Sequence, residues 1–146
     1  MQTGERSGID FLRAIRDGEI PPPPMAILMD FRIVEVEKGR AAFEGQPGEQ
    51  HYNPLGTVHG GWTMTILDSA MGCAVQTLLP PGVGYTTTDV QVRIIRALTH
   101  ETGKVRAEAV ALHVGRRTAV AEGRLLDAQG RLLAVGTTGC AVLGPT

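Results

Sequence analysis

The chain has 146 residues, a formal net charge of −1 and 42% hydrophobic residues. This length and hydrophobic content suit one globular domain with its own core and exclude a disordered chain. The balanced charge excludes the basic surface that nucleic-acid binding requires. The two cysteines, Cys73 and Cys140, belong to no CxxC or Cys/His cluster, so we expect no metal site.

The N-terminal residues are unlike a signal peptide, because they include Glu5, Asp10, Asp17 and Glu19 and contain no long apolar run. The most apolar stretch, residues 60–81, contains a charged residue and several hydroxyl side chains, which makes it too polar to span a membrane. We therefore expect a soluble, cytoplasmic protein without a membrane partner.

The first elements are short. Apolar residues between Ile9 and Ile15 predict an amphipathic helix. Pro21–Pro24 favours an extended connector. Residues 1–24 are thus predicted to form an N-terminal helix and a Pro-rich connector. Between Met25 and Glu49, interleaved polar and apolar residues on both sides of a Lys38-Gly39 turn predict a β-hairpin.

A long helix is predicted from Trp62 to Leu79, where Pro80-Pro81-Gly82 ends it. Its apolar residues surround the whole circumference, and Asp68 is its only charged residue. Because a helix that is apolar all round is buried all round, we place this helix at the centre of the domain.

The remaining chain changes to the alternating pattern of strands, which glycines and turn residues separate at the spacing of a meander. The predicted strands are Tyr85–Arg96, Lys104–Val114, Thr118–Asp127 and Leu132–Val142. The whole chain, residues 1–146, is then one α+β domain, in which a curved antiparallel sheet of five to six strands wraps a long central helix. One sheet cannot cover such a helix completely, so we expect a partner subunit to shield the rest.

Asp68 needs an explanation, because a buried carboxylate is costly unless it is paired or hydrogen-bonded. A structural ion pair or a solvent groove would provide one. The alternative is catalysis, since His59-Gly60-Gly61 at the helix start offers free amides and a positive dipole end to a developing oxyanion. Gly-Gly before a helix is also a common flexible entry. Asp68 lies roughly 12 Å beyond Gly60 along a helix, which favours a site shared by two antiparallel subunits.

The stretch His51–Gly61, followed by Leu67-Asp68, resembles the signature of hotdog-fold acyl-CoA thioesterases of the phenylacetate-pathway (PaaI-like) type. Pro21–Pro24, Thr86–Asp89 and Val114–Arg117 also look like this family. The resemblance implies the hotdog fold, a homodimer or homotetramer, and hydrolysis of an acyl-CoA to the free acid and CoA without metal or organic cofactor.

Carried over residue by residue, the resemblance makes Asp68 the general base or nucleophile and the Gly60 amide the group that polarises the thioester carbonyl. Asn53 and His59 match polar residues that flank the carbonyl or the water. Thr87 matches a hydroxyl position, often Ser, that helps to hold the water. Further candidates for substrate binding are Gly61, Val58, Thr86, Thr88 and Arg116.

Several of these residues have a second interpretation. His59 is either an acid/base group or the residue that orients the loop, and Asn53 could be only a turn residue before Pro54. Arg116, with Arg96 and Arg117, could clamp the CoA phosphates or belong to a solvated turn. We expect Asp89 to have a structural role in a pair with Arg93, and Cys73 to lie in the core. We expect His100 and His113 at strand edges, and Trp62, Met64 and Met71 in the core or in the acyl pocket.

Two other functions remain open beside thioester hydrolysis: a non-catalytic acyl-CoA binding module and a hotdog-type dehydratase or hydratase. The binding module is disfavoured because Asp68 is present and we expect no second domain. The dehydratase is disfavoured because the chain lacks the Pro-rich loop of such dehydratases.

The chain also lacks the GxSxG motif of a serine hydrolase and the second placed carboxylate of a glycosidase. The sequence does not determine the acyl group, which can be aromatic, medium-chain or hydroxylated. It also does not determine whether the protein is a dimer or a tetramer, or whether Asp68 acts as a base or forms an acyl-Asp anhydride. Residues 9–28 are a hypothetical cover of the acyl pocket.

Overall fold

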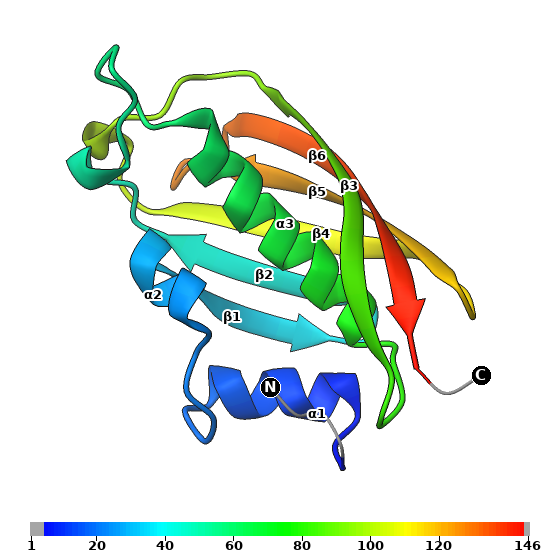
Figure 1. The fold of residues 1–146 in the computed structure, drawn as a ribbon. Coiled ribbons are helices and arrows are strands. Elements are labelled where there is room, and N and C mark those ends of the chain that lie inside the picture. Colours follow the sequence, from blue (N-terminus) through cyan, green and yellow to red (C-terminus); the bar gives the residue numbers. More distant parts are fainter. Residues whose placement is uncertain (1–4, 145–146) are drawn as a thin grey trace.

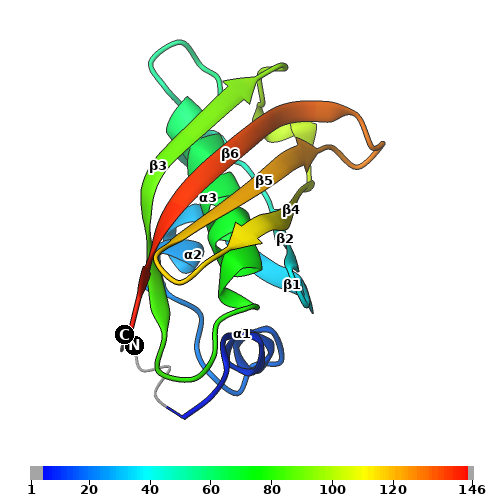
Figure 2. The ribbon, with the colours of Figure 1, turned by 90° about the vertical axis from the view of Figure 1, so that its right-hand side faces the viewer.

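The computed structural model describes residues 5–144. A six-stranded antiparallel sheet curls around one long helix, α3 (Gly60–Gln76), as Figure 1 shows. Seen from the side, the strands form a curved layer over the helix (Figure 2). The hotdog fold predicted from the sequence is therefore confirmed.

The sheet has the order β1-β2-β4-β5-β6-β3. Its strands, with their bounds, are β1 (Phe31–Glu37), β2 (Arg40–Gly45), β3 (Gly84–Ile94), β4 (Val105–Val114), β5 (Thr118–Leu126) and β6 (Leu132–Leu143). The simple meander suggested by the turn spacing is wrong for β3, which pairs with β6 at the far edge instead of with β4. The reason is that α3 crosses the concave face and delivers the chain to the opposite edge of the sheet (Figure 1).

The N-terminal segment contains two short helices that lie beside β1 (Figure 1). Helix α1 (Gly8–Arg16) confirms the predicted helix, and the Ser7 side chain caps it by accepting a hydrogen bond from the Asp10 amide. Helix α2 (Pro24–Met29) occupies residues that we assigned to the connector and to the start of the hairpin, so that assignment is wrong. Proline suits the first turn of a helix, where its missing N–H needs no partner, and the left-handed Asp30 (φ 56°) ends this one.

Helix α3 packs its apolar side against the sheet, where Trp62, Ile66 and Met71 are almost fully buried. It ends at Gln76 rather than at Leu79, because a tight turn leads from there into Pro80. Within the single chain it is not buried all round: Met64 is 41% exposed and Asp68 only half-buried, since the sheet leaves one side of the helix open. Within residues 5–144, no helix has the length and apolarity that crossing a bilayer requires.

Candidate active site

Asp68 lies on the open side of α3 and faces β3. The Thr87 hydroxyl donates a hydrogen bond of 2.8 Å to its Oδ1. No other described residue hydrogen-bonds to this carboxylate in residues 5–144, so Oδ2 is available to a ligand or water. The sheet brings Thr87 to Asp68 because β3 occupies the edge beside the helix. Of the predicted site residues, these two are joined directly.

At the start of α3, the amides of Gly60 and Gly61 differ in their hydrogen bonding. The His59 ring caps the helix, and its Nδ1 accepts the Gly61 N–H at 2.9 Å. Gly61 therefore has no N–H left for a ligand, whereas the Gly60 N–H makes no hydrogen bond within residues 5–144. This geometry favours the orienting interpretation of His59, and the role of the Gly60 N–H as donor to the substrate stays a prediction.

The loop before α3 is closed by Asn53. Its Oδ1 accepts hydrogen bonds from the amides of Leu55 (2.9 Å) and Thr57 (3.3 Å), and its Nδ2 donates to Thr57 Oγ1 (2.9 Å). The side chain thus holds the loop in shape, which is the turn role considered above. A direct contact of Asn53 with substrate stays a prediction.

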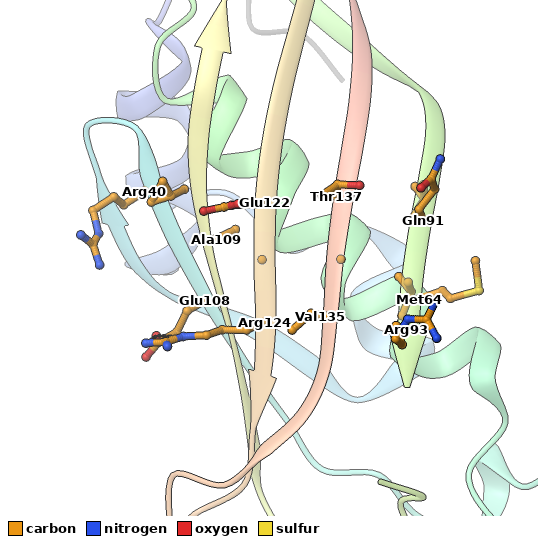
Figure 3. A pocket seen from close by; sticks show the side chains of 15 residues that line it. Arg40, Met64, Gln91, Arg93, Glu108, Ala109, Glu122, Arg124, Val135 and Thr137 are labelled. Carbon is orange, nitrogen blue, oxygen red and sulfur yellow. Dashed lines mark hydrogen bonds and ion pairs between the residues drawn. The ribbon is translucent and has the colours of Figure 1, made fainter. Parts of the chain in front are cut away.

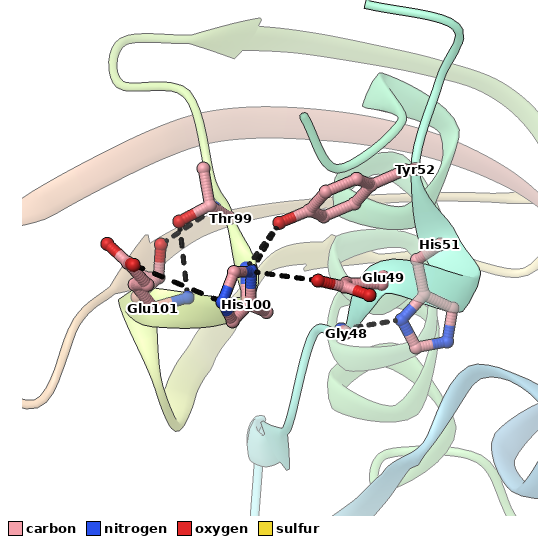
Figure 4. A network of polar contacts seen from close by, with 8 residues as sticks. Gly48, Glu49, His51, Tyr52, Thr99, His100 and Glu101 are labelled. Atoms are coloured by element: carbon pink, nitrogen blue, oxygen red, sulfur yellow. Dashed lines mark hydrogen bonds and ion pairs between the residues drawn. The ribbon is translucent and has the colours of Figure 1, made fainter. Parts of the chain in front are cut away.

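The same loop is tied to a distant segment through Tyr52, whose hydroxyl lies 2.7 Å from His100 Nδ1 and accepts the His100 amide at 3.0 Å (Figure 4). His100 belongs to the short helix His100–Thr102 between β3 and β4, so its assignment to a strand edge is wrong. Its ring also lies within 4.0 Å of Glu49 and Glu101 carboxylate oxygens. Sequence reasoning missed this pair because the two residues are 48 positions apart.

The remaining substrate-binding candidates do not gather around Asp68. Thr86 and Thr88 are exposed, and neither hydrogen-bonds to Asp68. Val58 is buried in the core, and Arg116 lies exposed in the turn between β4 and β5. Their contact with substrate stays a prediction. The considered Asp89–Arg93 ion pair is not formed among the described residues, and no metal-binding group of three His, Cys, Asp or Glu occurs in residues 5–144.

Residues 55–134, more than half of the chain, match the model of the thioesterase superfamily. The chain belongs to the thioesterase superfamily. A 1,4-dihydroxy-2-naphthoyl-CoA hydrolase of Listeria monocytogenes is 28% identical over 104 residues, which cover 70% of this chain and 82% of that protein. The family resemblance of the His51–Asp68 stretch is thereby confirmed, and the chain is a thioesterase-class enzyme.

Two solved structures are similar to this chain. A putative thioesterase related to phenylacetic acid degradation, from Ralstonia eutropha, has a TM-score of 0.81 at 25% identity and covers 90% of this chain and 98% of its own. The PaaI protein of the Escherichia coli phenylacetic acid degradation operon has a TM-score of 0.80 at 20% identity, with 96% and 97% covered. At that identity, the second likeness shows the fold alone.

Beside Asp68, the thioesterase has an apolar cavity of about 580 Å³ between α1, α2, β1 and α3. Cys73 and Tyr85, which sequence reasoning did not place in the site, line it. Burial, together with the negative charge of Asp68, raises the pKa of the Cys73 thiol to about 12, so this thiol is neutral at physiological pH. Helices α1 and α2 form one wall of the cavity and lie in the segment that the sequence analysis proposed as a cover of the acyl pocket, and that role stays a prediction. The sequence carried no such signal for Tyr85.

A second, broader groove of about 940 Å³ crosses the outer face of the sheet and also includes Met64 of α3, beside Arg93 of β3 (Figure 3). Charged side chains of both signs line it, including the ion pair of Arg124 with Glu108 at 3.2 Å. Neither Asp68 nor Gly60 belongs to its lining, so we separate this groove from the thioesterase site.

Proposed function

We propose that this thioesterase hydrolyses an aromatic or medium-chain acyl-CoA to the free acid and CoA, with Asp68 as the reacting carboxylate. The proposal rests on the state of Asp68: its Oδ1 accepts a hydrogen bond from Thr87, and its Oδ2 has no partner within residues 5–144. A carboxylate held in this way can take a proton from water. The name of the Listeria relative supports a CoA thioester as substrate.

The site needs a second subunit. Gly60, the free donor, and Asp68 lie eight residues apart on one helix, roughly 12 Å at ~1.5 Å per residue, which is too far for both to contact one carbonyl group. Strand β3 is an edge strand whose outer backbone groups have no partner in the sheet. If two copies of β3 paired antiparallel, the two α3 helices would also run antiparallel, and Gly60 of the partner subunit would approach Asp68. Such an interface would also cover Met64.

In the proposed reaction, Asp68 accepts a proton from a water molecule while the water oxygen attacks the thioester carbon. The carbonyl oxygen becomes negative and receives the N–H of Gly60 of the partner subunit, at the positive end of that helix. The carbon–sulfur bond then breaks, and the CoA thiolate takes the proton from Asp68. In an alternative route, the Asp68 carboxylate attacks the thioester carbon and displaces the CoA thiolate, which forms an acyl-Asp anhydride. Water then hydrolyses the anhydride to the acid and the Asp68 carboxylate, and the proton that is released goes to the thiolate.

Thiol release from a panel of acyl-CoAs tests the role of Asp68. We expect Asp68→Asn to lower kcat by about 10²–10⁴-fold with little change in KM, because substrate binding is kept while the base is lost. Asp30→Asn is the matched control: Asp30 is exposed at the end of α2, and Asn also suits its left-handed backbone. Undiminished turnover by a folded Asp68→Asn variant would contradict the proposal. Acyl-CoA binding without turnover by the wild type would indicate the binding-module alternative.

Subunit complementation tests the shared site. Gly60→Pro deletes the proposed donor N–H at the first helical position, where proline is well tolerated. Gly60→Ala keeps the N–H, and its Cβ would meet only the flexible end of Ile94 at 3.2 Å. Equal amounts of Gly60→Pro and Asp68→Asn subunits should restore about a quarter of wild-type activity. Random pairing makes about half of the dimers mixed, and each mixed dimer regains one of its two sites. Two inactive parents that stay inactive after verified subunit exchange would place the site within one chain.

A further inference from the structure

Strand β3 is irregular immediately beside the hydrogen bond between Thr87 and Asp68. Where it pairs with its neighbour β6 (Figure 2), Thr87 lies opposite Cys140 and Asp89 lies opposite Gly139, so Thr88 is an extra residue. Such a β-bulge bends its strand and redirects the side chains next to it. The direction of the Thr87 side chain therefore depends on the groups that hold the bulge.

Two hydroxyl groups hold this bulge. Thr88 Oγ1 donates to the Gly139 carbonyl at 3.1 Å, at an exposed position. Thr138 Oγ1 donates to the Asp89 carbonyl at 2.9 Å, and the Thr138 side chain is buried in the sheet. A Cβ atom on Gly139 would collide with the Asp89 carboxylate, so glycine makes room for the two residues opposite it. Because burial protects a hydrogen bond from competing water, we regard the Thr138 bond as the stronger constraint.

Cys140 contacts Thr87 from the opposite strand. Directly opposed residues of an antiparallel pair have their side chains on the same face of the sheet, and the Cys140 side chain is buried there. Burial raises the pKa of the Cys140 thiol above its usual value, although hydrogen bonding with the hydroxyls of Thr87 and Thr138 acts in the opposite direction. The thiol therefore keeps its proton at neutral pH and can act as a donor.

The protons of the two hydroxyls are already used. Thr87 donates its proton to Asp68, and Thr138 donates its proton to the Asp89 carbonyl. Since a hydroxyl has one proton and two acceptor lone pairs, the Cys140 S–H must be the donor in its contact with either hydroxyl. When it donates to Thr87 Oγ1, it opposes rotation of the Thr87 hydroxyl away from Asp68.

We propose that Thr138 and Cys140 of β6 are positioning residues of this thioesterase, which keep the Thr87 hydroxyl directed at Asp68. Thr138 acts by holding the bulge that follows Thr87, and Cys140 acts by donating to the Thr87 oxygen. Within residues 5–144 neither side chain hydrogen-bonds to Asp68, so both act through Thr87. The proposal rests on the function proposed above, in which Asp68 is the reacting carboxylate.

The first test removes each donor. Thr138→Val and Cys140→Ala should lower kcat by about 3–10-fold with little change in KM, the effect of one neutral hydrogen bond. Thr138→Ser and Cys140→Ser keep a donor and should retain most of the activity. Thr77→Val is the control, because it removes a buried hydroxyl that donates to the Ala74 carbonyl at 2.7 Å at the far end of α3. It should lower the stability without lowering kcat.

The second test repeats the changes in a Thr87→Val background, where no hydroxyl is left to position. There we expect Thr138→Val and Cys140→Ala to change kcat by less than about 1.5-fold, because coupled residues lose their separate effects. A general disturbance of the fold would instead lower kcat by the same factor in both backgrounds. This difference between the backgrounds separates positioning from a purely structural role.

Crystal structures of the Thr138→Val and Cys140→Ala variants give a measurement that needs no assay. We expect Thr87 Oγ1 to lie more than about 3.5 Å from Asp68 Oδ1, beyond hydrogen-bonding range. An unchanged 2.8 Å bond in both variants, or equal effects on kcat in the two backgrounds, would overturn the positioning role and leave the proposed function intact. No turnover of any acyl-CoA by the wild type would instead overturn the proposed function, and this proposal with it.

Discussion

Thr87 on β3 donates a hydrogen bond of 2.8 Å to the carboxylate of Asp68 on α3, across 19 residues of sequence. The bond holds one carboxylate oxygen, and the other has no partner within residues 5–144. Because the strand belongs to the sheet and the helix to its concave face, the orientation of this carboxylate depends on the packing of these two elements.

The Thr87 hydroxyl should be needed for turnover but not for folding. Thr87→Val keeps the shape of the side chain and removes the donor, so we expect kcat to fall by about 10–100-fold, as for a hydrogen bond to a charged group. Thr87→Ser keeps the hydroxyl and should retain most of the activity. Thiol release gives kcat, and circular dichroism checks the fold. Equal activity of the Val and Ser variants would contradict an orienting role.

The bond between Tyr52 and His100 should position the loop that Asn53 closes. Tyr52→Phe removes both hydrogen bonds of the hydroxyl, so we expect faster hydrogen exchange at the amides of residues 53–58 and a decrease of about 3–10-fold in kcat/KM. His113→Asn, on β4, is the control and should change neither quantity. If exchange in the loop does not change, Tyr52 has no positioning role.

The Cys73 thiol should react slowly and with a distinctive pH dependence. Its pKa of about 12 means that about 10⁻⁴ of the thiol is ionised at pH 8, compared with a quarter or so of an ordinary thiol. In a Cys140→Ser background, we expect iodoacetamide to react about 10³-fold more slowly with the native protein than with the unfolded one. The native rate should rise about tenfold per pH unit from pH 8 to 10, whereas a plateau near pH 9 would show an ordinary thiol.

Asp127 should stabilise the turn between β5 and β6 in a pH-dependent way. Burial opposes its ionisation, but hydrogen bonds from the Arg131 amide and side chain and from the Gln129 amide outweigh burial, so the pKa of Asp127 lies below its usual value. A lowered folded-state pKa gives a stabilisation that is complete above the unfolded pKa, about 3.9, and is lost as the pH falls through the folded value. We expect Asp127→Asn to lower Tm by about 2–4 °C between pH 5 and 7.

That difference in Tm should shrink below about pH 4, where the wild-type carboxylate also becomes protonated. Thermal unfolding of both proteins from pH 3 to 7 measures it, with Asp30→Asn as the control for loss of one exposed carboxylate. A difference that stayed constant through this range would show that the turn depends on the shape of the side chain and not on its charge.

Local patterns predicted much of the fold correctly. The alternation of Thr118–Leu126 and of Leu132–Leu143, and the apolar run of α3, depend on short-range periodicity, which is visible in the chain itself. The motif around His59 also identified the helix start correctly, since capping is a local interaction. Helix α2 was missed because its first residue, Pro24, belongs to the Pro21–Pro24 run that we assigned to an extended connector.

By itself, the sequence determined that one long helix with a single acid, Asp68, lies within an antiparallel sheet, because burial and periodicity are properties of neighbouring residues. The tertiary structure alone decided which strand faces that acid. Strand β3 lies at the far edge, so Thr87 reaches Asp68 and Tyr85 reaches Gly72, while α1 and α2 close a cavity beside them. Such contacts join segments far apart in the chain, and they form only when the core packs.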